Sequence, residues 1–131
     1  MADLEHNKQV ALSFYRALQE KDPVALDRVL AEDAQLWVAG TTPASGCCGK
    51  ARFMELFAHM RHAIDGPMTI VVDAVTAEGD RVAVLAHGIM KTASGKDYNQ
   101  DYHFFARVSG DQVVEMREYM DTELLRQVFA E

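Results

Sequence analysis

The spacing of hydrophobic residues changes once along this chain, near residue 65, and this change restricts the possible folds more than any other feature. Up to that point, apolar residues recur at helical spacing in three segments, residues 4–21, 23–30 and 50–64. Beyond Gly66-Pro67, four segments alternate as β-strands do, residues 68–77, 81–91, 98–108 and 112–121. This order predicts an α+β fold, in which three N-terminal helices pack on one side of a curved, mainly antiparallel sheet.

Three shorter segments complete the pattern. Residues 34–39 read as a short strand, and residues 40–49 read as a loop because they are rich in Gly, Ser and Thr. Residues 122–129 form a short amphipathic tail. No internal repeat or linker divides the chain, so we expect one domain that spans residues 1–131.

The composition is that of a globular protein, with 49% hydrophobic and 25% charged residues. The formal net charge of −7 argues against nucleic acid and anionic membrane surfaces as partners, because both require a basic surface. No apolar run reaches the length of a membrane span, and the first residues lack the features of a secretory signal. We therefore expect a cytoplasmic protein.

The two cysteines, Cys47 and Cys48, are adjacent in the sequence. Neighbouring cysteines bridge only through a strained ring, and two thiols are too few for a metal site. His59 and His62 lie one helical turn apart, but the sequence offers no evident third ligand. We therefore expect a reduced cysteine pair, no metal and no cofactor.

One acidic residue interrupts an apolar strand face in residues 112–121. Alternate residues share the side that we expect to face the core: Gln112, Val114, Met116, Glu118 and Met120. An unpaired buried charge costs much free energy, so a carboxylate in such surroundings is usually paired, protonated or functional. Glu118 is therefore the first candidate for a functional residue.

The loop before this strand predicts which residues lie opposite Glu118. A three-residue loop over residues 109–111, with Gly110 in the left-handed conformation, sets the register. That register places Tyr102 opposite Glu118, Phe104 opposite Met116, and Gln100 opposite Met120. A slip by one residue would bring the core side of one strand against the polar side of the other.

The preceding hairpin allows two registers. A two-residue turn at Ser94-Gly95 places His87 opposite Tyr102 and Ile89 opposite Gln100. Glu118, Tyr102 and His87 then form one row across three strands. A three-residue turn would instead bring Ala86 and Gly88 to this side and move His87 to the other face. We favour the first register.

Such a row suits acid–base chemistry. Apolar surroundings raise the pKa of a carboxyl toward neutrality, a neighbouring imidazole can share its proton, and a phenol can donate to a developing oxyanion. We therefore predict Glu118, His87 and Tyr102 as catalytic residues. The alternative is a buried polar network in which the same three side chains only fix the packing.

Several short motifs resemble the SnoaL-like branch of the NTF2-like superfamily. They include Asn7 with Val10 and Phe14-Tyr15, Ala31-Glu32-Asp33-Ala34, Gly46 to Gly49, Tyr98-Asn99, and above all Arg117-Glu118-Tyr119-Met120-Asp121-Thr122. The resemblance covers nearly the whole chain. It implies a cone-shaped α+β fold with an internal hydrophobic pocket for a small molecule and a homodimer formed across the sheet.

The resemblance to individual members differs in detail. Ketosteroid isomerases carry an acid where this chain has Leu36-Trp37-Val38, and epoxide hydrolases carry an arginine near Leu85, so neither set of residues is complete here. Polyketide cyclases use one acid on the final strand with polar neighbours, which Glu118, Gln100 and Tyr102 resemble most. The expected ligand-binding residues are Gln100, Trp37, Ile89, Phe104, Met116, Met120, Phe57 and Tyr15.

The expected function is acid–base chemistry of the isomerase or cyclase type on a small hydrophobic carbonyl or polyketide-like compound. Glu118 would move the proton, His87 would tune it, and Tyr102 and Gln100 would orient the substrate. A protein that binds such a molecule without turnover is the main alternative. A structural homodimer without a ligand is the other.

Overall fold

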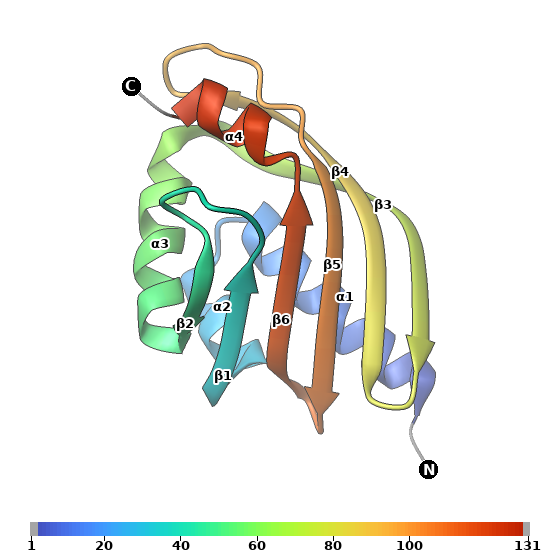
Figure 1. Ribbon diagram of the computed structural model, residues 1–131. Helices are drawn as coiled ribbons and strands as arrows, with labels where there is room; N and C mark the ends of the chain where they lie inside the picture. The colour runs from blue at the N-terminus through green and yellow to red at the C-terminus, as the bar shows by residue number, and fades with distance from the viewer. Residues whose placement is uncertain (1–2, 130–131) are drawn as a thin grey trace.

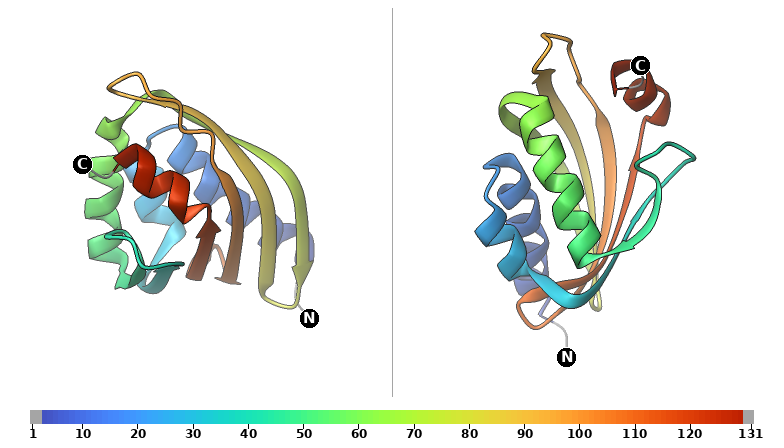
Figure 2. Two further views of the ribbon diagram at one scale, coloured as in Figure 1. Left: turned by 45° about the horizontal axis from the view of Figure 1, so that its top comes forward. Right: turned by 90° about the vertical axis from the view of Figure 1, so that its left-hand side faces the viewer.

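The computed structural model describes residues 3–129 and confirms the α+β architecture (Figure 1). The elements in chain order are α1 (Leu4–Gln19), α2 (Pro23–Val29), β1 (Leu30–Val38), β2 (Gly46–Gly49), α3 (Lys50–Ala63), β3 (Ile64–Glu78), β4 (Arg81–Thr92), β5 (Asp101–Ser109), β6 (Gln112–Met120) and α4 (Thr122–Phe129). Helices α1, α2 and α3 lie on one side of a curved sheet, and α4 lies near the end of β6 (Figure 2). We call the side of the sheet that faces α1–α3 the inner face and the opposite side the outer face.

Polar side chains fix the places where the helices begin. Asp3 accepts a hydrogen bond from the His6 amide at 3.1 Å and caps α1. Asp22 accepts from the amides of Val24 and Ala25 and caps α2, in which Pro23 is the first residue. These carboxylates satisfy amides that have no partner within the helix.

A buried lysine ties the beginning of α3 to the junction of α2 and β1. The Lys50 ammonium donates to the carbonyl oxygens of Asp27 at 2.9 Å and Leu30 at 3.0 Å. It also lies within 3.1 Å of the Asp27 carboxylate and 3.0 Å of the Glu32 carboxylate. No sequence motif indicated this anchor, which fixes α3 against the sheet.

The six strands form one sheet in the order β2-β1-β6-β5-β4-β3. All neighbouring pairs are antiparallel except β1 and β6, which run parallel with Leu36 beside Met116 and Val38 beside Glu118. β2 lies within the segment predicted as a loop, and β1 begins earlier than predicted. β2 adds hydrogen-bonded backbone beside residues 35–38 of β1, near Glu118, whereas the earlier start of β1 places Leu30 beside Val113 at the other end of β6.

The register between β5 and β6 differs from the prediction by two residues. Ser109 pairs with Gln112, so the turn contains only Gly110 and Asp111, and a bulge follows between the Val108–Val113 and Arg107–Glu115 pairs. As a result, Phe104 lies opposite Glu118 and Tyr102 lies opposite Met120. Because strand side chains alternate with a period of two, this shift leaves Glu118 on the inner face as predicted.

The register between β4 and β5 is the one that we did not favour. The Thr92 amide donates to the Lys96 carbonyl at 2.8 Å, and Lys91 pairs with Asp97, so the turn has three residues. Ala86 therefore lies opposite Tyr102, and His87 lies opposite Asp101 on the outer face. The predicted row of His87, Tyr102 and Glu118 is wrong, because a shift of one residue moves a side chain to the other face.

The core fills the space between the inner face and the three helices. Its largest fully buried side chains include Phe14, Phe104, Leu26, Leu36 and Met116. Leu36 and Met116 come from neighbouring strands, and Phe14 comes from α1. None of the helices in residues 3–129 is long and apolar enough to cross a membrane.

Candidate functional site

Glu118 lies on the inner face of β6, between two apolar neighbours. Phe104 is its partner on β5, and Val38 is its partner on β1. The backbone of this position is fixed, because the Ala39 amide donates to the Glu118 carbonyl at 2.9 Å. The strands therefore hold the side chain in a defined place and supply no polar group directly beside it.

The Glu118 carboxyl has no hydrogen-bond or ion-pair partner within residues 3–129, although the side chain is partly buried. Burial removes water that would stabilise the charged form, and this raises its pKa from the ordinary value of 4.5 to about 7. At neutral pH the carboxyl is therefore present in both protonation states. A group of this kind can accept and return a proton with little cost in either direction.

Three aromatic rings lie together beside Glu118. The rings of Tyr15 and Tyr102 both stack on Phe104, with centroid distances of 4.3 Å and 4.9 Å. Tyr15 comes from α1, and the other two rings come from β5. Among residues 3–129, the Tyr15 hydroxyl is the one buried side-chain oxygen or nitrogen without a hydrogen-bond partner. An unsatisfied buried hydroxyl costs free energy, so it marks a position where a ligand oxygen would be stabilised.

The negative charge of Glu118 acts on three phenols. Burial, and after it the charge of Glu118, raises the pKa of Tyr15 and of Tyr102 well above the ordinary value of 10.0. Burial also raises the pKa of Tyr98 to about 12, against the hydrogen bond from Gln100, which lowers it. All three hydroxyls therefore keep their protons at neutral pH, so they can serve as hydrogen-bond donors beside a carboxyl that titrates.

Gln100 is fully buried, but all of its polar groups are already engaged. Its amide nitrogen donates to the Tyr98 hydroxyl at 3.0 Å and to the Asp121 carbonyl at 2.9 Å. Its amide oxygen accepts from the backbone amides of Asp101 at 3.0 Å and Asp121 at 2.9 Å. The structure thus gives Gln100 no free donor or acceptor for the substrate contact that we expected.

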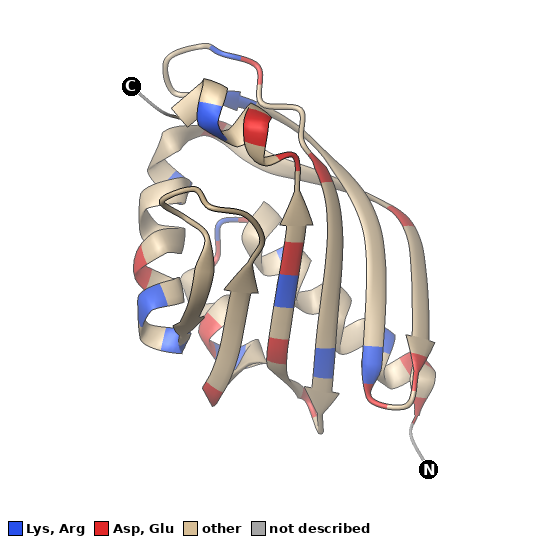
Figure 3. Ribbon diagram, viewed as in Figure 1, with Lys and Arg blue, Asp and Glu red and all other residues tan. Residues whose placement is uncertain are grey.

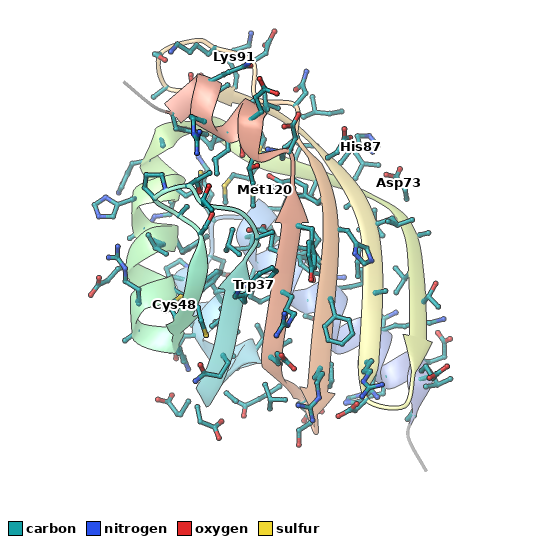
Figure 4. The ribbon with its side chains drawn as sticks, viewed as in Figure 1. Trp37, Cys48, Asp73, His87, Lys91 and Met120 are labelled. Atoms are coloured by element: carbon teal, nitrogen blue, oxygen red, sulfur yellow. The ribbon has the colours of Figure 1, made fainter. Side chains whose placement is uncertain are left out.

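Three predicted site residues lie on the outer face and do not face Glu118. His87 Nδ1 lies 2.8 Å from the Asp73 carboxylate, and the two side chains lie together in Figure 4. Ile89 is 55% exposed. Trp37 contacts the Tyr119 ring at 5.2 Å and the Arg117 guanidinium at 5.0 Å, because it pairs with Arg117 across the β1–β6 ladder. These three placements correct the predicted site.

The other predicted site residues are on the inner side. Met116 and Phe57 are almost fully buried, and Met120 is partly buried beside the tyrosines. The Tyr98 hydroxyl lies 4.0 Å from the Met120 sulfur. Tyr98 was not among the predicted site residues, although its position on the same strand face as Tyr102 would have indicated it.

Two of the larger surface hollows formed by residues 3–129 are not lined by Glu118. One of about 520 Å³ lies on the outer face among Asp80, Arg81, Phe105, Arg107 and Glu115. The other, of about 800 Å³, lies between α1, α2 and the turn that joins β5 to β6. The internal hydrophobic pocket that the sequence predicted beside Glu118 therefore stays a prediction.

Comparison with known proteins identifies the family. The SnoaL-like domain matches residues 11–116. An NTF2-like protein from Burkholderia xenovorans LB400 is 25% identical with a TM-score of 0.78, and the match covers 96% of this chain and 97% of that one. No curated protein sequence matches this chain.

Two further structures share the fold at lower identity. An LEH-like epoxide hydrolase from Mycobacterium tuberculosis is 15% identical with a TM-score of 0.77, covering 97% of this chain and 91% of that one. IdmH from Streptomyces antibioticus, proposed as a polyketide cyclase, is 16% identical with a TM-score of 0.78, covering 95% and 99%. The domain match over residues 11–116, together with the NTF2-like protein from Burkholderia xenovorans, shows that the chain belongs to the SnoaL-like family of NTF2-like proteins.

Proposed function

We propose that this protein moves a proton on a small hydrophobic carbonyl or polyketide-like compound, with Glu118 as the general acid–base. One observation carries the proposal: Glu118 is an unpaired carboxyl with a pKa of about 7, and the unpartnered Tyr15 hydroxyl lies in the same aromatic cluster. The names of the structural relatives, an epoxide hydrolase and a proposed polyketide cyclase, support chemistry on small organic molecules.

The proposed step begins with a ketone whose carbonyl oxygen accepts a hydrogen bond from a phenol, Tyr15 or Tyr102. The Glu118 carboxylate removes a proton from the carbon next to the carbonyl, and the C–H electron pair moves to form an enolate. The phenol proton stabilises the new charge on oxygen. Glu118, now protonated, returns the proton to the same or another carbon. Alternatively, the enolate carbon attacks a second carbonyl and closes a ring, the C=O π electrons move to oxygen, and the resulting alkoxide takes the proton from Glu118.

This proposal changes the roles expected from the sequence. Glu118 and Tyr102 keep the roles of proton carrier and donor, and Phe104, Met116, Met120 and Phe57 remain proposed ligand contacts. Tyr15 changes from a ligand contact to a second donor. His87 has no part in the step, because it lies on the outer face.

The test is exchange of solvent deuterium into a small aromatic ketone such as β-tetralone, followed by NMR. We expect exchange in the native protein to rise as the pH passes through about 7, because the base must be ionised. Glu118→Gln should lower the rate about 10²–10⁴-fold. Glu115→Gln is the matched control, since Glu115 lies on the same strand and pairs with Arg107 and Arg117. Equal exchange in the native protein and Glu118→Gln would contradict the proposal.

A binding protein without turnover is the second candidate. The unpartnered Tyr15 hydroxyl favours it, because a donor can hold a ligand oxygen without any proton transfer. Calorimetric titration with β-tetralone separates the two functions. Binding that survives Glu118→Gln and is lost in Tyr15→Phe, without exchange in the native protein, would assign a binding role.

We also propose that the outer face forms a homodimer. Leu85, Ile89 and Tyr119 are 51%, 55% and 41% exposed there, and large exposed apolar patches commonly mark interfaces. Sedimentation equilibrium should show a dimer that Ile89→Asp dissociates. Val24→Asp is the control, because Val24 is 65% exposed on α2, away from the outer face. A monomeric native protein would contradict the proposed homodimer. The cytoplasmic location stays a prediction.

A further inference from the structure

Helix α3, and helix α4 that follows the end of β6 beyond Glu118, carry partly buried apolar side chains that pack against the core. Met54 and Met60 lie on α3, and Leu124 and Val128 lie on α4. Helices α3 and α4 lie on opposite sides of this end of the sheet, as the right-hand view of Figure 2 shows. Apolar residues that stay partly exposed at the edge of a core are suited to contact an apolar molecule on its way in.

The first residues of α4 are held firmly. Gln100 binds both the amide and the carbonyl of Asp121, and the Asp121 carboxylate accepts from the Leu124 amide at 3.1 Å. Thr122 packs so closely on Gly40 that a Cβ at Gly40 would lie 2.8 Å from the Thr122 methyl. The beginning of α4 is therefore a fixed point.

The far end of α4 packs against the core through partly buried side chains. Leu125 is its one buried residue among those described, and Phe129 meets the Tyr98 ring edge-to-face with a centroid distance of 4.9 Å. Tyr98 itself is almost fully buried, and its hydroxyl is fixed by Gln100. Of the two rings, Phe129 is the less buried, and its edge-to-face contact with Tyr98 adds only a modest attraction.

The Tyr98 side chain connects this contact to the candidate site. Its hydroxyl lies 4.0 Å from the Met120 sulfur, and Met120 follows Glu118 on the inner face of the same strand. The charge of Glu118 also contributes to the raised pKa of Tyr98. A molecule that passes Phe129 and Tyr98 would therefore arrive beside Met120 and Glu118.

We propose that the Tyr98–Phe129 pair is the gate of the Glu118 site and sets the size of molecule that reaches it. The helix α4 turns about Asp121 and Thr122, and the contact between the two rings breaks when the gate opens. The proposal rests on the proposed function for the choice of Glu118 as the site, but access to Glu118 can be measured without any turnover.

The experiment measures thiol labelling rates in a Cys47→Ser, Cys48→Ser background that carries Glu118→Cys as the reporter. The probes are methyl methanethiosulfonate, which is small, and fluorescein maleimide, which is bulky. We expect the reporter to react readily with the small reagent and slowly with the bulky one. Phe129→Ala should raise the labelling rate of the bulky reagent about tenfold and leave the rate of the small reagent nearly unchanged. The reason is that the substitution removes the aromatic attraction that keeps the gate closed.

Two controls separate the gate from general loosening. Val24→Ala changes an exposed apolar residue on α2 and should leave both rates unchanged. Asp73→Asn changes an exposed residue of β3 on the outer face, so it should also label as the parent does. Equal rates for both reagents in the parent, or no selective change in Phe129→Ala, would overturn the gate.

A second measurement tests the gate without the variant, in case Phe129→Ala does not fold. Hydrogen exchange of the unmodified chain should show the amides of α4 near Val128 exchanging faster than those near Leu125. Uniform protection along α4 would contradict the proposed motion. Because these readouts do not involve catalysis, a failed gate and a failed acid–base function give different results: the first leaves deuterium exchange intact, and the second leaves selective labelling intact.

Discussion

The inner and outer faces of the sheet differ in how their charged side chains are paired. On the outer face charged residues form pairs: Arg107 with Asp80, Arg117 with Glu115, and His87 with Asp73. Acidic and basic positions follow one another along β6 (Figure 3), and two of these residues, Glu115 and Arg117, belong to the outer face. On the inner face of the same strand, Glu118 is unpaired within the part of the chain that the structure describes.

This difference shows which charge serves the fold. A paired carboxylate on a wet surface costs little to keep, whereas an unpaired one in apolar surroundings lowers the stability of the folded state. Glu118 has a higher pKa when folded, so the folded protein binds its proton more tightly than the unfolded chain does. The charge of Glu118 therefore opposes folding at neutral pH, which agrees with the acid–base role proposed for it.

The largest expected difference in stability is between alanine substitutions of two neighbouring phenylalanines on opposite faces of the sheet. Phe104 is 1% exposed and touches both tyrosine rings, while Phe105 is partly exposed on the outer face. We expect Phe104→Ala to lower the free energy of unfolding by about 3–5 kcal/mol, because it leaves a cavity. Phe105→Ala should cost far less in urea denaturation of the monomer at low protein concentration. Equal losses would remove the distinction between the faces.

The two glutamates of β6 should contribute to stability at neutral pH with opposite signs. Unfolded Glu118 ionises near 4.5 and folded Glu118 near 7, so stability is lost as the pH rises between these values and stays lower above them. Glu118→Gln should therefore gain about 2 kcal/mol above pH 7 and nothing below pH 4.5.

Glu115→Gln should instead lose about 0.5 kcal/mol at neutral pH, since Glu115 pairs with Arg107 at 3.6 Å and Arg117 at 3.4 Å. Thermal unfolding across the pH range measures both variants. If Glu118→Gln were destabilising above pH 7, Glu118 would have a partner that the structure does not show.

A smaller difference is expected between alanine substitutions at Gly88 and at its neighbour Ile89. A Cβ at Gly88 would clash with the Met90 methyl, which can move, and would lie 3.2 Å from the Tyr102 ring. Gly88→Ala should cost about 1 kcal/mol and shift the Tyr102 ring signals in NMR. Ile89→Ala, at a 55% exposed position, should leave those signals in place, and a shift in both variants would contradict the face assignment.

The smallest effect is expected for the pair of His87 and Asp73. Both side chains are more than a third exposed, and ion pairs of this kind contribute about 0.5 kcal/mol or less. Asp73→Asn should therefore change stability very little and leave the pKa of Glu118, followed by NMR of labelled glutamate, unchanged. A clear shift in that pKa would restore a connection between His87 and the inner face.

Two turns explain which parts of the site could be predicted from the sequence. The β5–β6 turn was predicted one residue too long, and the bulge after it adds another residue, so the total shift is two and the facing of Glu118 is right. The β4–β5 turn was predicted one residue too short, so His87 and Ile89 were placed on the wrong face. Hydrophobic periodicity predicts the strands themselves, but turn length and bulges depend on backbone geometry that composition indicates only weakly.

Other features depend on contacts between distant segments. Trp37 was expected to line the pocket, but its pairing with Arg117 places it on the outer face. The parallel pairing of β1 with β6 and the role of Gln100 at Asp121 also join residues far apart in the chain. The order of the elements and the inner position of Glu118 are local properties, and these were predicted correctly.

The place of β6 in the sheet has a consequence for the time course of folding. β6 is the last strand along the chain, but it lies between β1 and β5, so β1 and β2 join the other three strands only when β6 is inserted. Closing the long loop that brings Leu36 beside Met116 makes this step entropically costly and therefore slow. Because Glu118 is on β6, a nascent chain gains its sheet and its reactive carboxyl in the same late event.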